Sequence, residues 1–220
     1  IPPLPVQTEI VRILDNFTEL TAELTAELTA RKKQYEHYRH ELLTFGNNDV
    51  PRMTLGEVGT VCMCKRILKS ETSTTGEVPF YKIGTFGQTP NAFISKETFE
   101  KYKAQYNYPN KGDILISAAG TIGRTVVFDG EPAYFQDSNI VWLAHDESKV
   151  LNKFLIYCYA MSPWQISTGG TIARLYNDNI RNAVIPVPTI EEQRRIVDLL
   201  EKFDVICNDI SSGLPAEIVA

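Results

Sequence analysis

The sequence lacks long hydrophobic runs and an excess of positive charge. No apolar stretch approaches the ~20 residues that a helix needs to cross a bilayer, and the Pro-rich start shows no secretory leader, so we expect a cytoplasmic chain with no membrane partner. The 22 Lys and Arg residues are outnumbered by 27 Asp and Glu residues, for a net charge of −5. This balance excludes a uniformly basic nucleic-acid coat and leaves room for a local basic face.

Cysteine is scarce, and patterns typical of enzymes are absent from the sequence. Cys62, Cys64, Cys158 and Cys207 have neither the density nor the spacing of a disulfide scaffold, and Cys-x-Cys alone is poor evidence for zinc. We therefore expect four reduced thiols and no metal. No Gly-rich nucleotide loop follows a strand, no Asn/Asp-Pro-Pro-aromatic tetrad could grip a flipped base, and no nuclease arrangement of acidic residues appears. We predict a non-enzymatic chain with no catalytic residue and no cofactor; an enzyme of another type would need a pocket that the sequence does not reveal.

Composition and charge divide the chain into three regions. Gly46–Asp49 followed by Pro51 is a typical helix stop, and Pro186 with Pro188 marks a second boundary. Residues 46–184 carry 14 basic and 13 acidic side chains, whereas both ends have an acidic excess. We therefore predict a middle domain at 46–186, which would make any contact with a polyanion, between helical regions at 1–45 and 187–220.

The two ends are copies of one another. Residues 1–17 align with residues 187–203 without a gap, at a constant offset of 186. Six positions of the seventeen are identical, where chance gives about one: Pro2/Pro188, Gln7/Gln193, Ile10/Ile196, Val11/Val197, Leu14/Leu200 and Phe17/Phe203. This internal repeat is the most informative feature of the sequence.

Each copy continues as an amphipathic helix with apolar residues at alternating spacings of three and four. These residues are Ile10, Ile13, Phe17, Leu20 and Leu24 in the first copy, and Ile196, Leu199, Phe203, Ile206 and Ile210 in the second. The first helix can run for some 40 residues, about 60 Å, which is too long for one small domain to cover. It contains a tandem repeat, TAEL, at 21–24 and 25–28, which displaces the apolar seam without breaking it. We predict an antiparallel coiled-coil spacer in which the two stripes bury each other.

The middle region alternates short β-branched and aromatic runs with turn signals. Strands are predicted at 78–85, 114–117, 125–128 and 140–143, with turns at 110–112, 129–130 and 168–170. Helices are predicted at about 96–105 and 149–161. The fold class is therefore α+β, with a mixed α/β domain between the two long helices.

The repeated ends and several middle segments resemble a known family. The two Pro-rich turns with their Gln and helix, the TAEL units and RKKQYEHYRHELLTF at Arg31–Phe45 resemble the specificity subunit of a type I restriction-modification system. Other segments are similar to a target recognition domain of that family: TLGEVG at Thr54–Gly59, GDILISAAGTIGRTVVF at Gly112–Phe128, YFQDSNIVWL at Tyr134–Leu143 and GGTIARLYNDNIRNAVIPVP at Gly169–Pro188. The resemblance covers essentially the whole chain.

This resemblance implies a subunit that reads one half of a bipartite site on double-stranded DNA. It also implies docking to modification (methyltransferase) subunits, which would bind the methyl donor, and contact with a restriction subunit through the complex. The family usually joins two recognition domains and two helical regions in one chain, whereas here one domain lies between two helical copies. We therefore expect a half-subunit or a fragment; a half-subunit would form a homodimer. The alternative is a coiled-coil scaffold that binds proteins and not DNA.

A small-residue loop, 118–124, lies between two predicted strands. Glycine allows close approach of the backbone, threonine and amide groups can hold a phosphate, and Arg124 can bridge phosphates or read guanine. The alternative is a tight β-turn with a solvated Arg124. The candidates for DNA contact at this loop are Ser117, Thr121 and Arg124.

Other candidate side chains have donors or acceptors suited to phosphates or base edges. Basic residues at 65–69 could track a phosphate strand or be a solvated loop, and amides at 136 and 139 could pair with adenine or bond neighbouring backbone. The group after the glycines at 169–170 could instead be a rigid loop that holds the next helix. These candidates are Lys65, Arg66, Lys69, Tyr81, Lys82, Thr85, Gln136, Asn139, Arg174, Tyr176 and Asn177.

Overall fold

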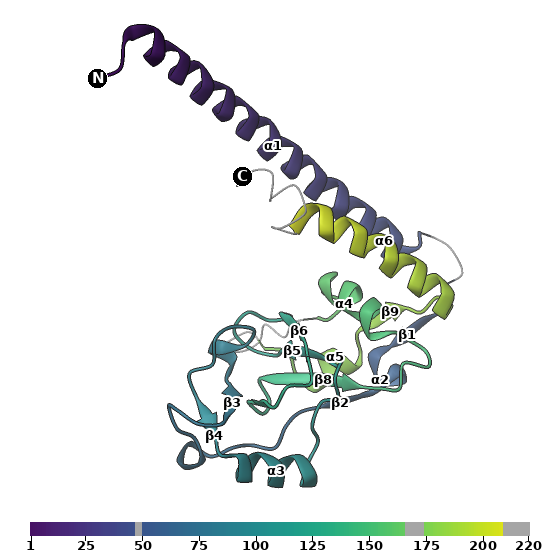
Figure 1. Ribbon diagram of the computed structural model, residues 1–220. Coiled ribbons are helices and arrows are strands. Elements are labelled where there is room, and N and C mark those ends of the chain that lie inside the picture. Colours follow the sequence, from purple (N-terminus) through teal and green to yellow (C-terminus); the bar gives the residue numbers. More distant parts are fainter. Residues whose placement is uncertain (47–49, 166–173, 209–220) are drawn as a thin grey trace. The chain divides into compact units, whose positions relative to one another are not determined.

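The computed structural model describes residues 1–46, 50–165 and 174–208. The chain forms two compact units (Figure 1). A helical unit comprises Ile1–Gly46 and Arg194–Ala220, and a mixed α/β unit comprises Asn47–Gln193. The predicted turn at 168–170 and Ile210 of the predicted seam lie outside the described residues.

The first helix, α1 (Leu4–Thr44), contains 41 residues and spans about 60 Å. Proline is tolerated in its first turn because the first amide groups of a helix have no partner within the helix. The helix ends where Phe45 and Gly46 both take left-handed conformations, each with φ 57°. The predicted stop at residues 46–49 is therefore placed within two residues of the observed end.

The second long helix, α6 (Ile190–Asn208), runs antiparallel to the C-terminal part of α1. The Phe203 ring lies 6.2 Å from the Tyr35 ring and 5.7 Å from the Tyr38 ring, measured between centroids. Further along α6, Cys207 is close enough to Lys32 and Arg31 for their charges to act on its thiol. Burial and a hydrogen bond to Asp204 raise the pKa of Tyr35 to about 12. The predicted antiparallel pair is confirmed, and Figure 1 shows the two helices side by side.

The helical pairing is shorter than the sequence predicts. Ile10, Ile13, Phe17 and Leu20 keep between 40% and 62% of their surface exposed. The described part of α6 has only 19 residues, about 28 Å, so it cannot run along a helix of twice that length. In α6 itself the buried apolar residues are Ile196, Val197, Leu200 and Cys207, whereas Ile206 is 44% exposed. Within the described residues, the expectation that the two stripes bury each other is therefore wrong for the segment of α1 from Ile10 to Leu20.

Three small sheets are present in the described residues of the mixed α/β unit. The four-stranded sheet is antiparallel, in the order β2 (Thr60–Cys62), β8 (Ile140–Ala144), β5 (Ile114–Ser117), β6 (Thr125–Val127). The three-stranded sheet has the order β4 (Phe93–Ile94), β3 (Val78–Tyr81), β7 (Tyr134–Phe135), with β3 and β7 parallel. The third sheet pairs β1 (Arg52–Thr54) with β9 (Val184–Pro186).

Short helices complete this unit. They are α2 (Leu55–Val58), α3 (Lys96–Gln105), α4 (Asn152–Ala160) and α5 (Asn177–Arg181), with 3₁₀ turns η1 (Lys69–Glu71) and η2 (Ile83–Thr85). Ser95 caps α3 by accepting a hydrogen bond from the Thr98 amide. The two predicted helices are confirmed. The strand predicted at 78–85 ends at Tyr81, because residues 83–85 turn as η2.

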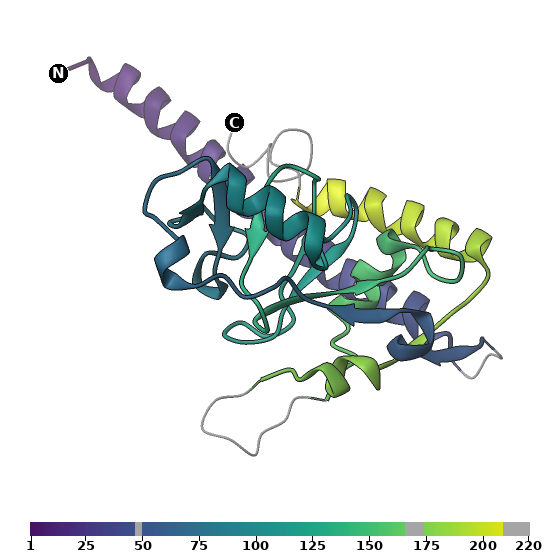
Figure 2. The same ribbon diagram turned by 90° about the horizontal axis from the view of Figure 1, so that it is seen from below.

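One aromatic core joins the three-stranded and four-stranded sheets. Its largest members are Phe80, Phe86, Phe99, Phe128, Tyr134, Phe135 and Trp142. Helix α3 packs on the three-stranded sheet, where Tyr102 meets the edge of Tyr134 at 6.0 Å (Figures 1 and 2). Strand β7 belongs to one sheet and β8 to the other. The connection between them, residues 136–139, therefore passes from sheet to sheet.

The two copies of the internal repeat make the same hydrogen bond in the structure. Gln7 Nε2 donates a hydrogen bond to the Pro2 carbonyl (2.7 Å), and Gln193 Nε2 donates one to the Pro188 carbonyl (2.9 Å). In each copy the glutamine thus reaches back five residues to the proline that precedes the helix. The predicted equivalence of the two copies extends to this contact.

Candidate nucleic-acid interface

Two arginines donate hydrogen bonds to the connection between β7 and β8. Arg174 Nη2 donates a hydrogen bond to the Ser138 carbonyl (2.6 Å), and Arg66 Nε donates one to Asp137 Oδ2 (3.0 Å). Ser138 has φ 58°, a conformation that residues other than glycine rarely adopt. Because the arginines come from segments about 70 residues before and 36 residues after the loop, tertiary structure fixes this turn.

A hollow of about 500 Å³ lies beside this loop. Six of the residues predicted to contact DNA line it: Arg66, Lys69, Lys82, Gln136, Asn139 and Arg174. Four of these carry a positive charge, and Asp137 is the one carboxylate among the lining residues that the structure describes. We call this surface the basic hollow. It is the local positive face that the chain's net charge of −5 leaves room for.

Two further hollows adjoin the same loop. One, of about 440 Å³, is lined by Ser138, Arg174, Tyr176 and Asn177 among others. The other, of about 470 Å³, is lined by Lys65, Arg66, Asp137 and Tyr106 among others, and Lys65 Nζ lies 5.2 Å from the centre of the Tyr106 ring. Nine of the predicted residues therefore line one continuous neighbourhood around residues 136–139.

The remaining five predicted residues do not line these three hollows. Arg124 Nη1 donates a hydrogen bond to the Phe86 carbonyl (2.9 Å). Ser117 is 1% exposed, and its hydroxyl donates to the Thr121 carbonyl and accepts from the Arg124 amide. This geometry favours the tight-turn interpretation of residues 118–124. Contact of Ser117, Thr121 and Arg124 with DNA stays a prediction.

Tyr81 and Thr85 also have partners within the fold. The Tyr81 ring stacks on Phe135 with 5.8 Å between centroids. Thr85 Oγ1 accepts a hydrogen bond from the Lys82 amide (3.2 Å), which closes the η2 turn. These contacts give both side chains a structural role; a role for them in DNA contact is untested.

The side-chain amide of Gln136 fits both roles considered for it, a bond to neighbouring backbone and a contact with a ligand. Its Oε1 accepts a hydrogen bond from the Ile83 amide (2.9 Å), as an amide that satisfies nearby backbone would. That bond uses the carbonyl oxygen, and the side chain still lines the basic hollow. Its amide nitrogen is the group suited to a ligand.

Asp137 and Tyr106 belong to this surface but were not predicted from the sequence. Asp137 adjoins a candidate amide in the sequence, but an acidic residue is not expected where phosphates bind. Tyr106 follows the end of α3, and only the folded chain brings it to Lys65. The signal that the sequence offered for Asp137 was its position between two candidate amides, Gln136 and Asn139.

Other kinds of site find no support in the described parts of the chain. Within residues 1–46, 50–165 and 174–208, no three His, Cys, Asp or Glu side chains are grouped so that they could hold a metal ion. Over the same ranges, no helix combines the length and apolar character that a membrane span requires. Cys62, Cys64, Cys158 and Cys207 form no disulfide in the structure.

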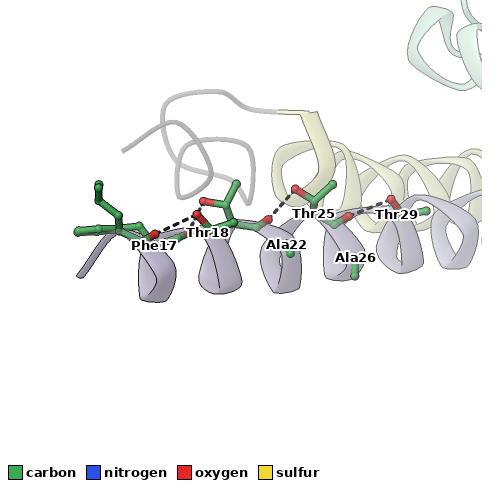
Figure 3. A pocket seen from close by; sticks show the side chains of 8 residues that line it. Phe17, Thr18, Ala22, Thr25, Ala26 and Thr29 are labelled. Carbon is green, nitrogen blue, oxygen red and sulfur yellow. Dashed lines mark hydrogen bonds between the residues drawn. The ribbon is translucent and has the colours of Figure 1, made fainter. Parts of the chain in front are cut away.

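The TAEL region of α1 presents an open face of Thr and Ala side chains, bordered by Leu14 and Phe17 (Figure 3). Thr25 and Thr29 each donate their hydroxyl to the carbonyl four residues earlier, at 2.7 Å and 2.9 Å. The hydroxyls are thereby satisfied within the helix. The residues that line this face are uncharged, which suits packing against another surface. Its lining residues are Leu14, Phe17, Thr18, Thr21, Ala22, Thr25, Ala26 and Thr29.

The α+β fold and the paired helices agree with membership of a family of specificity domains from restriction-modification systems. Residues 47–220 match the family model described as the type I restriction modification DNA specificity domain, and the chain belongs to this family. The resemblance seen in the sequence is confirmed.

Individual relatives cover the chain almost completely. The Haemophilus influenzae protein named as type I restriction enzyme specificity subunit S.HindORF215P is 58% identical over 227 residues, which span 99% of this chain and 58% of that protein. The Escherichia coli EcoR124I/EcoR124II specificity subunit is 34% identical, over 98% of this chain and 56% of that protein. The chain therefore spans little more than half the length of these relatives.

Solved structures share the fold. The HsdS subunit from Thermoanaerobacter tengcongensis superposes with a TM-score of 0.69 at 20% identity, over 96% of this chain and 54% of that chain. The S subunit from M. genitalium superposes with a TM-score of 0.56 at 19% identity, over 97% of this chain and 58% of that chain. The predicted α+β class with a long helical spacer is confirmed.

Proposed function

We propose that this chain reads one half of a bipartite site on double-stranded DNA as part of a type I specificity subunit. The observation that carries the proposal is the basic hollow: cationic and amide side chains from segments far apart in the sequence converge on one loop of an acidic chain. Membership of the DNA specificity family supports the same conclusion.

The side chains around residues 136–139 divide by chemistry into two kinds of contact. Lys69 and Lys82 are exposed cations that line the basic hollow and suit phosphates. Asn139 and the amide nitrogen of Gln136 suit base edges in the major groove, where adenine offers both a donor and an acceptor. Tyr176, which is 57% exposed, offers a flat face and a hydroxyl at the rim.

Chemistry is assigned to partner subunits in this proposal. The chain acts as a non-catalytic subunit without its own cofactor, modification subunits bind the methyl donor and methylate DNA, and a restriction subunit joins through the complex. The helical unit is the part proposed to dock the modification subunit. The exposed apolar stripe of α1, from Ile10 to Leu20, supports a helical partner there, supplied by a second recognition half or by a second copy in a homodimer.

The test is DNA binding by the full chain across a salt series. Lys69→Ala and Lys82→Ala should each weaken binding to all duplexes and reduce the slope of log affinity against log salt by about one. Lys101→Ala is the matched control, since Lys101 is exposed on α3 and does not line the three hollows. Fluorescence anisotropy with labelled duplexes measures both quantities. A chain that shows no salt-dependent binding would instead be the scaffold.

A further inference from the structure

Asp137 is the anomalous member of the basic hollow. Its carboxylate lies among Arg66, Lys69, Lys82 and Arg174, and it also lines the adjoining hollow with Lys65. The side chain of Asp137 is 16% exposed, whereas that of Arg66 is 70% exposed. A largely buried carboxylate therefore lines two of the three hollows of the surface proposed to meet DNA.

A carboxylate in this position opposes the main source of DNA affinity. Phosphate contacts dominate affinity, and a negative charge repels them. The ion pair with Arg66 gives little in return, because pairs with an exposed partner contribute weakly to stability. A purely structural role thus leaves the position of Asp137 poorly explained.

The loop also has other means of support. The Ser138 carbonyl accepts a hydrogen bond from Arg174, and the Gln136 amide donates one to the Tyr81 carbonyl (2.9 Å). The Ala118 amide donates to the Asn139 carbonyl (2.7 Å), and the Ile140 amide to the Gln136 carbonyl (3.1 Å). These bonds hold the backbone on both sides of Asp137 without its carboxylate.

The carboxylate has accepting capacity left after its bond to Arg66. Arg66 Nε and, at 3.5 Å, the Ser138 hydroxyl both donate to Oδ2, and an ionised carboxylate offers two oxygens with about four lone-pair positions. In the major groove, cytosine N4 and adenine N6 are amino donors, whereas guanine O6 and thymine O4 are acceptors that a carboxylate repels. The same charge that repels phosphates therefore distinguishes bases by their amino groups.

We propose that Asp137 is a specificity-determining residue of the half-site. It accepts a hydrogen bond from the exocyclic amino group of cytosine or adenine at one position, and it disfavours guanine and thymine there. Arg66 is a positioning residue, because its bond fixes the direction of the carboxylate. This inference rests on the proposed function, and it specifies which bases the half-site accepts at one position.

The experiment is selection of bound duplexes from a randomised library by the full chain, followed by sequencing. Wild type should show one position restricted to cytosine or adenine. Asp137→Asn should reduce that discrimination by about 10-fold to 100-fold and shift it toward adenine, because an asparagine amide can bridge adenine N6 and N7. The other positions should keep their letters. Asp146→Asn is the matched control, since Asp146 is an exposed carboxylate that accepts hydrogen bonds from Ser148 and does not line the three hollows.

Two further variants keep the test decisive if Asp137→Asn folds poorly. Asp137→Glu retains the carboxylate and should retain the restricted letter with weaker discrimination. Arg66→Ala retains Asp137 but removes the bond that orients its carboxylate, so it should weaken affinity for all duplexes and relax the restricted position without the shift toward adenine expected of Asp137→Asn. Thermal unfolding of each variant reports whether the fold is intact.

The outcomes separate this inference from the proposed function. If wild type selects a half-site and Asp137→Asn selects the same letters, or binds all duplexes more tightly with no change of preference, Asp137 is not a reader and only this inference fails. A folded Asp137→Glu variant that selects a different letter also overturns it. If wild type binds no duplex in a salt-dependent manner, the proposed function itself fails.

Discussion

The two copies of the internal repeat carry the same residues in opposite environments. In the second copy, Gln193, Ile196, Val197 and Leu200 are at most 3% exposed. Their counterparts Ile10, Val11 and Leu14 are 45%, 55% and 58% exposed. The comparison teaches that the motif determines where a helix starts and which face is apolar, whereas burial depends on the partner that the face meets.

The glutamines show the same difference in hydrogen bonds. Both donate to the proline carbonyl five residues earlier. Gln193 additionally donates to the Lys149 carbonyl (2.8 Å), and its Oε1 accepts from the Leu151 amide (2.9 Å). The second copy thus uses the whole amide to tie the helix start to the segment before α4, and three backbone groups depend on it.

The largest expected effect on stability comes from truncating Leu200, which we compare with truncating its counterpart in the first copy, Leu14. Leu200→Ala should lower the free energy of unfolding by about 2 to 5 kcal/mol, because it leaves a cavity at a fully buried site. Leu14→Ala should change it by less than about 0.5 kcal/mol, as is usual for exposed positions. Urea unfolding of the full chain, followed by circular dichroism, measures both. Equal effects of the two substitutions would contradict the difference in environment.

A smaller effect is expected from the paired glutamines. Gln193→Ala should cost about 2 to 3 kcal/mol, since it leaves the Leu151 amide and two carbonyls without their partner. Gln7→Ala should cost about 0.5 kcal/mol, because it removes one exposed hydrogen bond. Thermal unfolding compares the two, with Gln193→Glu as a variant of similar size. A Gln7→Ala variant as unstable as Gln193→Ala would show that the first copy also has a buried partner.

The smallest effect on stability is expected from changing the number of TAEL units, which only α1 contains. One added unit lengthens the helix by about 6 Å and rotates the part of α1 beyond the insertion by about 40°. One added base pair advances DNA by about 3.4 Å and rotates it by about 34° to 36°. If the helices separate two recognition halves, the unread spacer of the bipartite site should grow by one base pair, with each half-site unchanged.

Methylation mapping of the assembled complex, with one unit added and one removed, checks this geometry. One added unit lengthens the helix by about 3 Å more than one base pair lengthens DNA, and helix tilt or DNA deformation must absorb this difference. A spacer that grows by two base pairs is therefore the alternative result. Altered half-site letters would rule the helices out as the spacer. So would an unaltered spacer with full activity.

The sequence predicts local and periodic features of this fold well. The end of α1 follows from the stop signal at Gly46, and α3 follows from Ser95 and a helical pattern. The parallel pairing of β3 with β7 was not predictable, because it joins residues about 50 positions apart through side chains of a shared core. The extent of helix pairing also escaped prediction, since an apolar stripe reads the same whether it is covered or exposed.

For the candidate site, too, the sequence predicts the local chemistry of residues but not their arrangement in space. Residue chemistry singled out Arg66, Lys82 and Arg174, but no spacing in the sequence indicates that they share one hollow. Arg124 has equally suitable chemistry, and only the fold shows its guanidinium bonded to the Phe86 carbonyl. Asp137 was not among the predicted site residues, because only the folded chain shows that cations surround its carboxylate.

The connection at residues 136–139 has a consequence for how such a module changes over generations. Of its four residues, Gln136 accepts a hydrogen bond from the Ile83 amide, whereas the side chains of Asp137, Ser138 and Asn139 belong neither to a strand nor to the aromatic core. If Asp137 and Asn139 read bases as proposed, their substitution can alter which bases are accepted while the scaffold keeps its stability. A population of cells could in this way acquire a new DNA preference through a few codons, without a period in which the protein fails to fold.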